Sequence, residues 1–447
     1  MSVYHGSMES EAAMADTADS DFDGLVGKQE ERLGDLVVEG FKKLINTYDP
    51  DQDDLERPEP KPLPDSSRLD AEKTKRGLLS WLELSLLPQL GQQITDLSAL
   101  LDLTDLQKET DSTLRQILES QAELDQSLGK LQTSLYTLCP EPARSPPFES
   151  SDRNRKEFKS FRAHGLYHHI TGQVLSEIIH VFNESYELIQ QLELSTEPYK
   201  FPVEIDATRT AITHYAASTR DGIGSTIRWL KGSEFDLLRS HWLNEISGMN
   251  DTLSKLISLI NSPPNTTGRP QLSLVPELDS FHYHPPSQPV IRLAKSVPPL
   301  LKLSRLFFKK MTRPEIDTKR LASFTQSASH QLDHMAQSAG NIGCDFEELL
   351  KLFRKVDRRV DRLGRPIQEE EEPLVSSVQL TAITQRIGIR FQSYLFIILL
   401  YFHPVIPNNH SFDSQNHSKA WFLAWFNHFS IAVRNFEIAA EFFDDDA

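Results

Sequence analysis

The chain has 447 residues, of which 38% are apolar and 25% charged, so it is long enough to bury a sizeable core. Its formal net charge is −17, and residues 1–70 alone hold 18 Asp/Glu against 7 Lys/Arg. This acidity excludes non-specific nucleic-acid binding by the whole surface. The only two cysteines, Cys139 and Cys344, exclude a disulfide framework and a cysteine-rich zinc site.

The N-terminal stretch MSVYHGSMESEAAMADTADSDFDG has neither the basic nor the apolar segment of a signal peptide. We therefore expect a reducing, cytoplasmic or nuclear setting. Residues 1–22 lack periodicity and are predicted to be disordered. An amphipathic helix is predicted over 23–48, followed by a Pro-rich acidic linker over 49–67.

The clearest helical pattern lies between Asp111 and Leu138, where apolar residues follow one another in steps of three and four and only Gln121 interrupts the row. A second stripe contains Leu243, Ile246, Leu253, Ile257 and Ile260. Two more run from Phe346 to Leu363 and from Phe422 to Phe443. These stripes predict helices with one buried face each.

Strand patterns are nearly absent, and Pro-rich stretches separate the helical patterns. The sequence thus predicts an all-α, multi-helix bundle of about nine to eleven helices. A coiled coil is the alternative for the long heptad-like rows, but the frequent prolines favour an antiparallel bundle. We expect two sub-bundles, an N-terminal one over 68–262 and a C-terminal one over 289–443, joined by a Pro-rich connector over 263–288 and followed by an acidic tail over 444–447.

The most apolar stretch, FQSYLFIILLYFHP, spans Phe391–Pro404. A membrane-spanning helix needs about 20 mostly apolar residues. Extending this run back to Ile387 gives sixteen residues, which include Arg390, and Pro404 ends the helix. The sequence therefore favours a buried core helix over a membrane or interfacial segment.

Four segments carry a family resemblance: SLLPQLGQQITDLSALLDL (Ser85–Leu103), PVIRLAKSVPPLLKLSRLFFKKM (Pro289–Met311), FIILLYFHPVIP (Phe396–Pro407) and KAWFLAWFNHFSIAVRNFEIAAEFF (Lys419–Phe443). As a set, they resemble a family of uncharacterised all-helical proteins expanded in rust fungi. The resemblance implies an intracellular helical protein without an assigned activity, and it supplies no catalytic residues. The layout is also loosely similar to cyclin-D-binding helical-bundle proteins, as an analogy of architecture alone.

Motifs for chemistry are weak. The chain has no GxxxxGK[ST] loop, no GxSxG elbow and no complete pair of terpene-cyclase metal motifs. Cys344, placed just before a predicted helix, is the better candidate for a reactive thiol, although a structural role is favoured. His164, His168 and His169 cluster, as do His282 and His284, but a zinc site needs more convergent ligands. We predict no enzyme and no catalytic, cofactor-binding or metal-binding residues.

One predicted helix is strongly basic. Residues 351–365, KLFRKVDRRVDRLGR, hold seven Lys/Arg and two Asp. Helical spacing puts the basic residues opposite an apolar stripe. The predicted candidate face for an anion or partner contains Lys351, Arg354, Lys355, Arg358, Arg359, Arg362 and Arg365.

Two functions remain open. The favoured one is a non-enzymatic helical interaction or scaffold protein with an unidentified protein partner. The alternative is a binder of anionic lipid or nucleic acid through the cationic helix face at 351–365.

Overall fold

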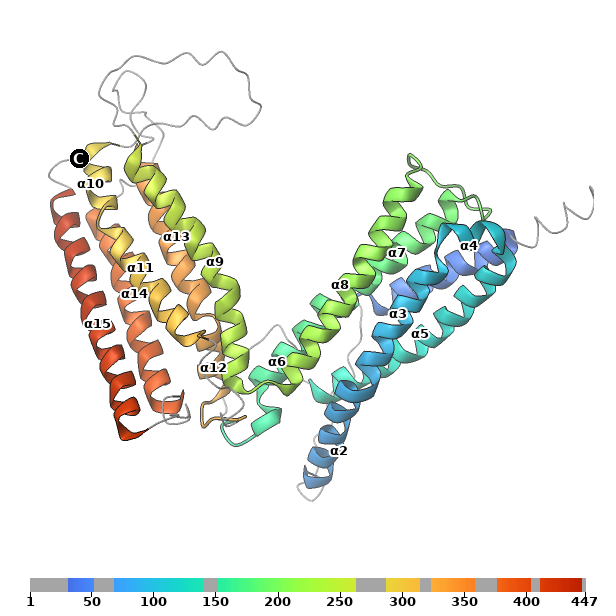
Figure 1. The fold of residues 1–447 in the computed structure, drawn as a ribbon, viewed down its shortest axis with the longest axis horizontal. Coiled ribbons are helices and arrows are strands. Elements are labelled where there is room, and N and C mark those ends of the chain that lie inside the picture. The colour runs from blue at the N-terminus through green and yellow to red at the C-terminus, as the bar shows by residue number, and fades with distance from the viewer. Residues whose placement is uncertain are drawn as a thin grey trace, which may run out of the picture. The chain divides into compact units, whose positions relative to one another are not determined.

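The computed structural model describes residues 31–51, 68–139, 152–262, 287–313, 323–357, 376–402 and 411–443, and their regular secondary structure is all helical. Besides the helical residues 31–48, and when a helix that continues through a π-helical segment is counted once, the described residues form 12 helices, 11 of them with seven or more residues. The predicted all-α fold is confirmed. The chain divides into two compact units (Figure 1): unit 1 contains Met1–Pro147 and Arg162–Lys231, and unit 2 contains Phe148–Phe161 and Gly232–Ala447.

Unit 1 begins with the helical residues 31–48, the described part of the helix predicted over 23–48. Long helices follow, and α3 packs against both α5 and α8, while α7 packs against α8. The first helix joins them through Phe41, whose ring lies 5.7 Å from that of Phe182 in α7. The elements are α2 (Arg68–Trp81), η2 (Leu82–Leu86), α3 (Leu87–Leu100), α4 (Leu103–Lys108), α5 (Thr110–Leu138), α6 (Ser160–His168), η4 (His169–Leu175), α7 (Ser176–Gln191) and α8 (Ile205–Lys231).

Gln121 explains the one interruption in the apolar stripe of α5. Its side chain is buried, and its Nε2 donates a hydrogen bond to the carbonyl oxygen of Val37, 2.9 Å away in the first helix. Gly40 makes room for it, because a Cβ added to Gly40 would lie 2.1 Å from Oε1 of Gln121. A polar residue in the stripe therefore fixes where the first helix docks.

Unit 2 is a ring of helices in which each long helix packs against two neighbours, in the order α9, α11, α15, α14, α13 and back to α9. The shorter α10 and α12 also pack against members of the ring. The elements are η3 (Lys156–Phe158), α9 (Glu234–Asn261), α10 (Gln288–Ala294), α11 (Val297–Met311), α12 (Ser329–Ala336), α13 (Ser338–Asp357), α14 (Ser377–Ile397), η6 (Ile398–Phe402) and α15 (Ser411–Glu441).

Aromatic side chains fill the centre of that ring. The Phe391 ring of α14 lies 5.2 Å from Phe307 of α11 and 4.8 Å from Phe429 of α15. Trp242 of α9 is completely buried and donates from Nε1 to the carbonyl oxygen of Met335, 2.8 Å away. Large rings contribute much buried apolar area per residue, so they hold the ring of helices together.

The division between the units falls between Lys231 and Gly232, whereas the sequence placed it in the Pro-rich 263–288 stretch. The reason is α9, which the sequence assigned to the N-terminal bundle but which packs against α11 and α13 of unit 2. A capping box starts this helix: the amide of Asp236 donates to Ser233 Oγ, and the amide of Ser233 donates to Asp236 Oδ2. Residues 263–286 lie outside the described residues, as do the predicted N-terminal segment 1–22, most of the linker over 49–67 and the tail over 444–447.

The apolar stretch from Phe391 is buried on one side only. Phe391, Tyr394, Ile398 and Phe402 belong to the core, while Phe396 keeps 65% of its surface exposed. The prediction of a core helix thus holds for half of its residues, because α14 lies in the wall of the ring and not in its centre. In the part of the chain that the structure describes, no helix is long and apolar enough to cross a membrane.

Candidate functional site

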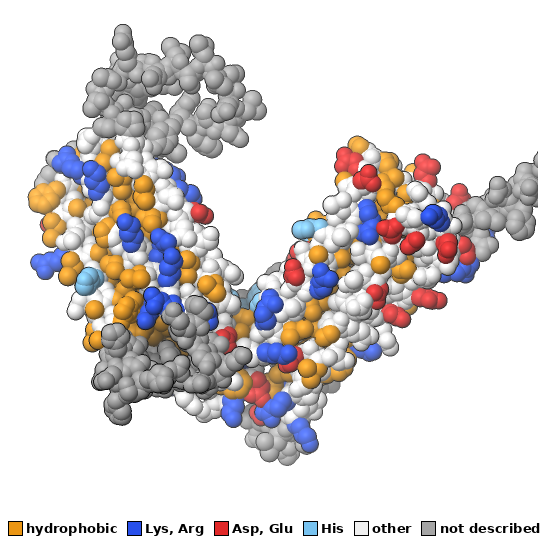
Figure 2. Space-filling view, viewed as in Figure 1, with side chains coloured by type: hydrophobic (Ala, Val, Ile, Leu, Met, Phe, Trp, Pro, Cys, Tyr) orange, Lys and Arg blue, Asp and Glu red, His pale blue; other side chains and the backbone are white. Residues whose placement is uncertain are grey.

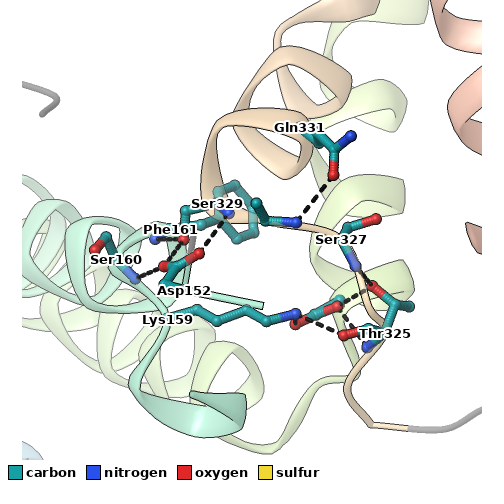
Figure 3. Close-up of polar contacts among 10 residues, drawn as sticks. Asp152, Lys159, Ser160, Phe161, Thr325, Ser327, Ser329 and Gln331 are labelled. Carbon is teal, nitrogen blue, oxygen red and sulfur yellow. Dashed lines mark hydrogen bonds and ion pairs between the residues drawn. The ribbon is translucent and has the colours of Figure 1, made fainter. Parts of the chain in front are cut away.

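A closed polar cluster lies between the segment 152–161, the start of α9 and residues 325–331 of unit 2 (Figure 3). Lys159 Nζ donates to Glu234 Oε1 at 2.5 Å and to the carbonyl oxygen of Thr325 at 2.8 Å. The second oxygen of Glu234, Oε2, accepts from the amide of Thr325 at 2.7 Å and from its hydroxyl at 2.6 Å. Neither charged side chain has exposed surface.

Asp152 forms the second half of this cluster. Its Oδ1 accepts from the amide of Ser329 at 2.9 Å, and its Oδ2 accepts from the Ser329 hydroxyl and, at 2.8 Å, from the amide of Ser160. Burial by itself raises the pKa of Asp152, but these hydrogen bonds outweigh it and hold the pKa below its usual range.

Both carboxylates of the cluster are thus occupied by hydrogen bonds, and the Lys159–Glu234 pair is closed to solvent. A substrate cannot reach an ion pair without exposed surface, so the cluster is a structural connection. It ties the segment 152–161 to α9 and to the start of α12. No sequence motif could have found it, because Lys159 and Glu234 are 75 positions apart and Asp152 and Ser329 are 177 apart.

The predicted cationic face falls partly on α13. Lys351 and Arg354 are exposed there, and Lys355 is half-buried. The other four predicted residues, Arg358, Arg359, Arg362 and Arg365, lie outside the described residues, as α13 is described to Asp357. The structure therefore brings together three of the seven residues on one helix.

A second basic surface, on α10 and α11, was not singled out from the sequence. Residues 287–313 contain seven Lys/Arg and no Asp/Glu. In Figure 2, blue side chains lie over this part of unit 2 with orange ones between them. The signal was present in the sequence as Lys295, Lys302 and Lys309, which are spaced seven residues apart.

An apolar surface lies on α14 and α15. Val378, Ile389 and Phe396 are exposed on α14 and Leu400 on η6, which continues it, and the four recur at intervals that return to the same side of a helix. The charged side chains of α14, Arg386 and Arg390, are paired with Asp345 and Glu348 of α13. The neighbouring α15 exposes Leu423, Ile431 and Ile438, with the exposed Arg434 between the two isoleucines, and the exposed Phe442 follows the last residue of α15. We call these eight residues the α14–α15 apolar face.

The histidine cluster is a pair of rings on one helix face. Nε2 of His164 lies 3.1 Å from Nε2 of His168. Burial, followed by the nearby His164 and His169, lowers the pKa of His168. Among the described residues, no group of three or more His, Cys, Asp or Glu could hold a metal ion. His282 and His284 lie outside the described residues.

The two cysteines differ in environment. Cys139 donates from Sγ to the carbonyl oxygen of Ala163 at 3.1 Å, and burial raises its pKa to about 12. Cys344 is exposed, but it lies within α13, which begins at Ser338. The expectation that Cys344 precedes a helix is therefore wrong, because six residues of α13 come before it.

Two family models match the chain. The Domain of unknown function (DUF8723) matches residues 75–231, and the Domain of unknown function (DUF8721) matches residues 233–438. The gap between the matches coincides with the division of the compact units at Lys231 and Gly232. No curated protein and no solved structure matches. The predicted likeness to an uncharacterised family is confirmed.

Proposed function

We propose that the protein is a non-enzymatic interaction protein that binds a protein partner through the α14–α15 apolar face. The single observation that carries this proposal is the row of exposed apolar side chains Val378, Ile389, Phe396 and Leu400 along α14 and η6. Single exposed apolar residues need no explanation, but an aligned row of them does.

The dimensions of this face suit a partner. Val378 and Leu400 are 22 residues apart, which corresponds to about 33 Å along a helix. Two packed helices of that length present on the order of 600 Å², close to the roughly 800 Å² that each side of a standard interface buries. The two arginines of α14, Arg386 and Arg390, are already paired with Asp345 and Glu348, so the chemistry of this helix favours an apolar protein surface over a phosphate-bearing ligand.

Affinity capture of the full chain, compared between Phe396→Ser/Leu400→Ser and the wild type by quantitative mass spectrometry, tests the proposal. The matched control is Leu36→Ser/Leu84→Ser, because both residues are exposed leucines of unit 1. We expect one or more proteins, or a second copy of this chain, to be retained by the wild type and the control and lost from the α14 variant. Equal capture by all three chains would refute the role of this face.

Anion binding by α13 is the second candidate function. It is supported by the exposure of Lys351 and Arg354 on the same helix. Lys351→Glu/Arg354→Glu is expected to leave the fold intact, since surface changes usually alter stability by no more than about 0.5 kcal/mol each. Reduced, salt-sensitive binding of an anionic oligonucleotide or vesicle by this variant would favour this candidate over the first.

A further inference from the structure

The basic residues of α10 and α11 form a local concentration of charge. Unit 2 holds 27 Lys/Arg and 27 Asp/Glu, so its net charge is zero. Unit 1 holds 20 Lys/Arg and 37 Asp/Glu and therefore carries the whole net charge of −17. Within this neutral unit, the 27 residues from 287 to 313 have seven basic side chains and no acidic one: Arg292, Lys295, Lys302, Arg305, Lys309, Lys310 and Arg313.

Three of these lysines, Lys295, Lys302 and Lys309, are exposed and spaced seven residues apart in the sequence. Lys302 and Lys309 both lie on α11, where seven residues make two turns, about 10 Å, and put the two side chains on the same side of the helix. Lys295 lies in the turn between α10 and α11, just before α11 begins. Within the described ranges, none of the three forms an ion pair with a carboxylate.

Apolar groups interrupt this row. Leu306 lies between Lys302 and Lys309 and keeps 44% of its surface exposed. Beside it, Lys310 places its Nζ 5.5 Å from the centre of the Trp421 ring of α15, and Trp421 is half-buried. We call Lys295, Lys302, Leu306, Lys309, Lys310 and Trp421 the α11 basic face.

We infer that the α11 basic face docks on a membrane surface rich in anionic lipid. Lysines on flexible stems keep their charges at headgroup level while an exposed leucine and an indole enter the interface below them. Each cation near such a surface adds to the attraction, and Trp prefers this depth of a bilayer.

Nucleic acid is the less suitable occupant of this face. Stacking of unpaired bases needs a series of open aromatic faces, and here Lys310 already lies over the one indole present on the α11 basic face. The inference does not depend on the α14–α15 apolar face, which consists of different residues, although Trp421 and part of that face both lie on α15.

Sedimentation of the full chain with vesicles tests this inference. The vesicles contain phosphatidylcholine with about 30% phosphatidylserine, and pure phosphatidylcholine vesicles serve as the reference. We expect the wild type to pellet only with the anionic vesicles and to be released when NaCl rises from about 0.1 M to about 0.5 M. The variant Lys295→Gln/Lys302→Gln/Lys309→Gln should bind about a hundredfold more weakly.

The matched control is Lys73→Gln/Lys108→Gln/Lys130→Gln, which makes the same change in net charge at exposed lysines of unit 1 and should bind like the wild type. Leu306→Ser should lower vesicle binding several-fold, because it removes the apolar contact and keeps every charge. Circular dichroism checks that each variant is folded.

Three outcomes would overturn the inference. The first is a wild type that does not pellet with anionic vesicles, or pellets equally with neutral ones. The second is a loss of binding in Lys351→Gln/Arg354→Gln but not in the α11 variant, which would move the site to α13. The third is that the wild type binds a single-stranded oligonucleotide more tightly than the anionic vesicles, and that this binding is weakened by the triple lysine variant but not by Leu306→Ser. That result would assign the face to nucleic acid.

Discussion

Nζ of Lys159 lies 2.5 Å from Oε1 of Glu234, and both side chains are completely buried in unit 2. Removing one partner of such a pair leaves a buried charge without compensation. We therefore expect Lys159→Met to lower the free energy of unfolding of unit 2 by about 3–5 kcal/mol. Urea unfolding followed by tryptophan fluorescence and circular dichroism measures this loss.

The control for that variant is Lys255→Met, an exposed lysine of the same unit, which should change little. The double variant Lys159→Met/Glu234→Gln should lose less than the sum of the two single changes, because each single change leaves one buried charge unpaired and the double change leaves none. Additive losses would show that the two residues are not coupled.

Asp152 makes the free energy of unfolding depend on pH. Its folded-state pKa lies below the usual value of 3.8, because hydrogen bonds from Ser329 and Ser160 outweigh the opposing effect of burial. The stabilisation is therefore complete above the unfolded-state pKa and is lost as the pH falls through the folded-state pKa. Asp152→Asn should lower the free energy of unfolding at neutral pH and flatten its decline below about pH 4.

Urea titrations between about pH 6 and about pH 3 measure that decline. The exposed Asp251, replaced by Asn, is the matched control on α9 and should leave both the stability and its acid dependence close to those of the wild type. A decline in Asp152→Asn as steep as in the wild type would refute the role of this carboxylate.

Gly40 sets the distance between the first helix and α5. Alanine is a better helix former than glycine by about 1 kcal/mol, yet its Cβ at position 40 would meet Oε1 of Gln121 at 2.1 Å. We expect Gly40→Ala to destabilise unit 1 by about 1–3 kcal/mol, as overpacking of a buried contact does. In a Gln121→Ala background the same change should become neutral or stabilising, and thermal melts of the four chains test this reversal of sign.

Phe391 and Phe396 are five residues apart on α14 and differ in environment: the first is completely buried and the second is 65% exposed. Phe391→Ala should cost about 3–5 kcal/mol of unfolding free energy, because it empties the centre of the aromatic core. Phe396→Ala should change stability by less than about 0.5 kcal/mol. Equal losses in urea unfolding would contradict the placement of α14 in the wall of the ring.

The fold class could be predicted because periodic apolar residues and proline breaks are local signals. Which side of each helix is buried could be predicted less well. Leu243 and Ile257 fit the expected stripe of α9 but are exposed, while Met249 and Leu256 are buried in their place. A helix in a ring contacts two neighbours, so its buried side is wider than a single row and its centre cannot be read from spacing alone.

The candidate surfaces show the same limit. The sequence directed attention to the dense basic run at 351–365 and not to Lys295, Lys302 and Lys309, whose spacing was equally visible. What could not be read was which basic residues lack acidic neighbours in space. The Lys159–Glu234 pair forms between segments that meet only in the folded unit, so no local sequence pattern predicts it.

The chain enters unit 2 twice, first for the segment 148–161 and again from Gly232 onward, with most of α6 to α8 between. During synthesis, Asp152 and Lys159 therefore leave the ribosome before their partners Ser329 and Glu234. Neither contact can form until residues 162–231 of unit 1 have been synthesised. A fragment cut at residue 233, where the second family match begins, would separate Glu234 from its only buried cation among the described residues. Such a fragment should aggregate unless residues 148–161 are supplied as a separate peptide.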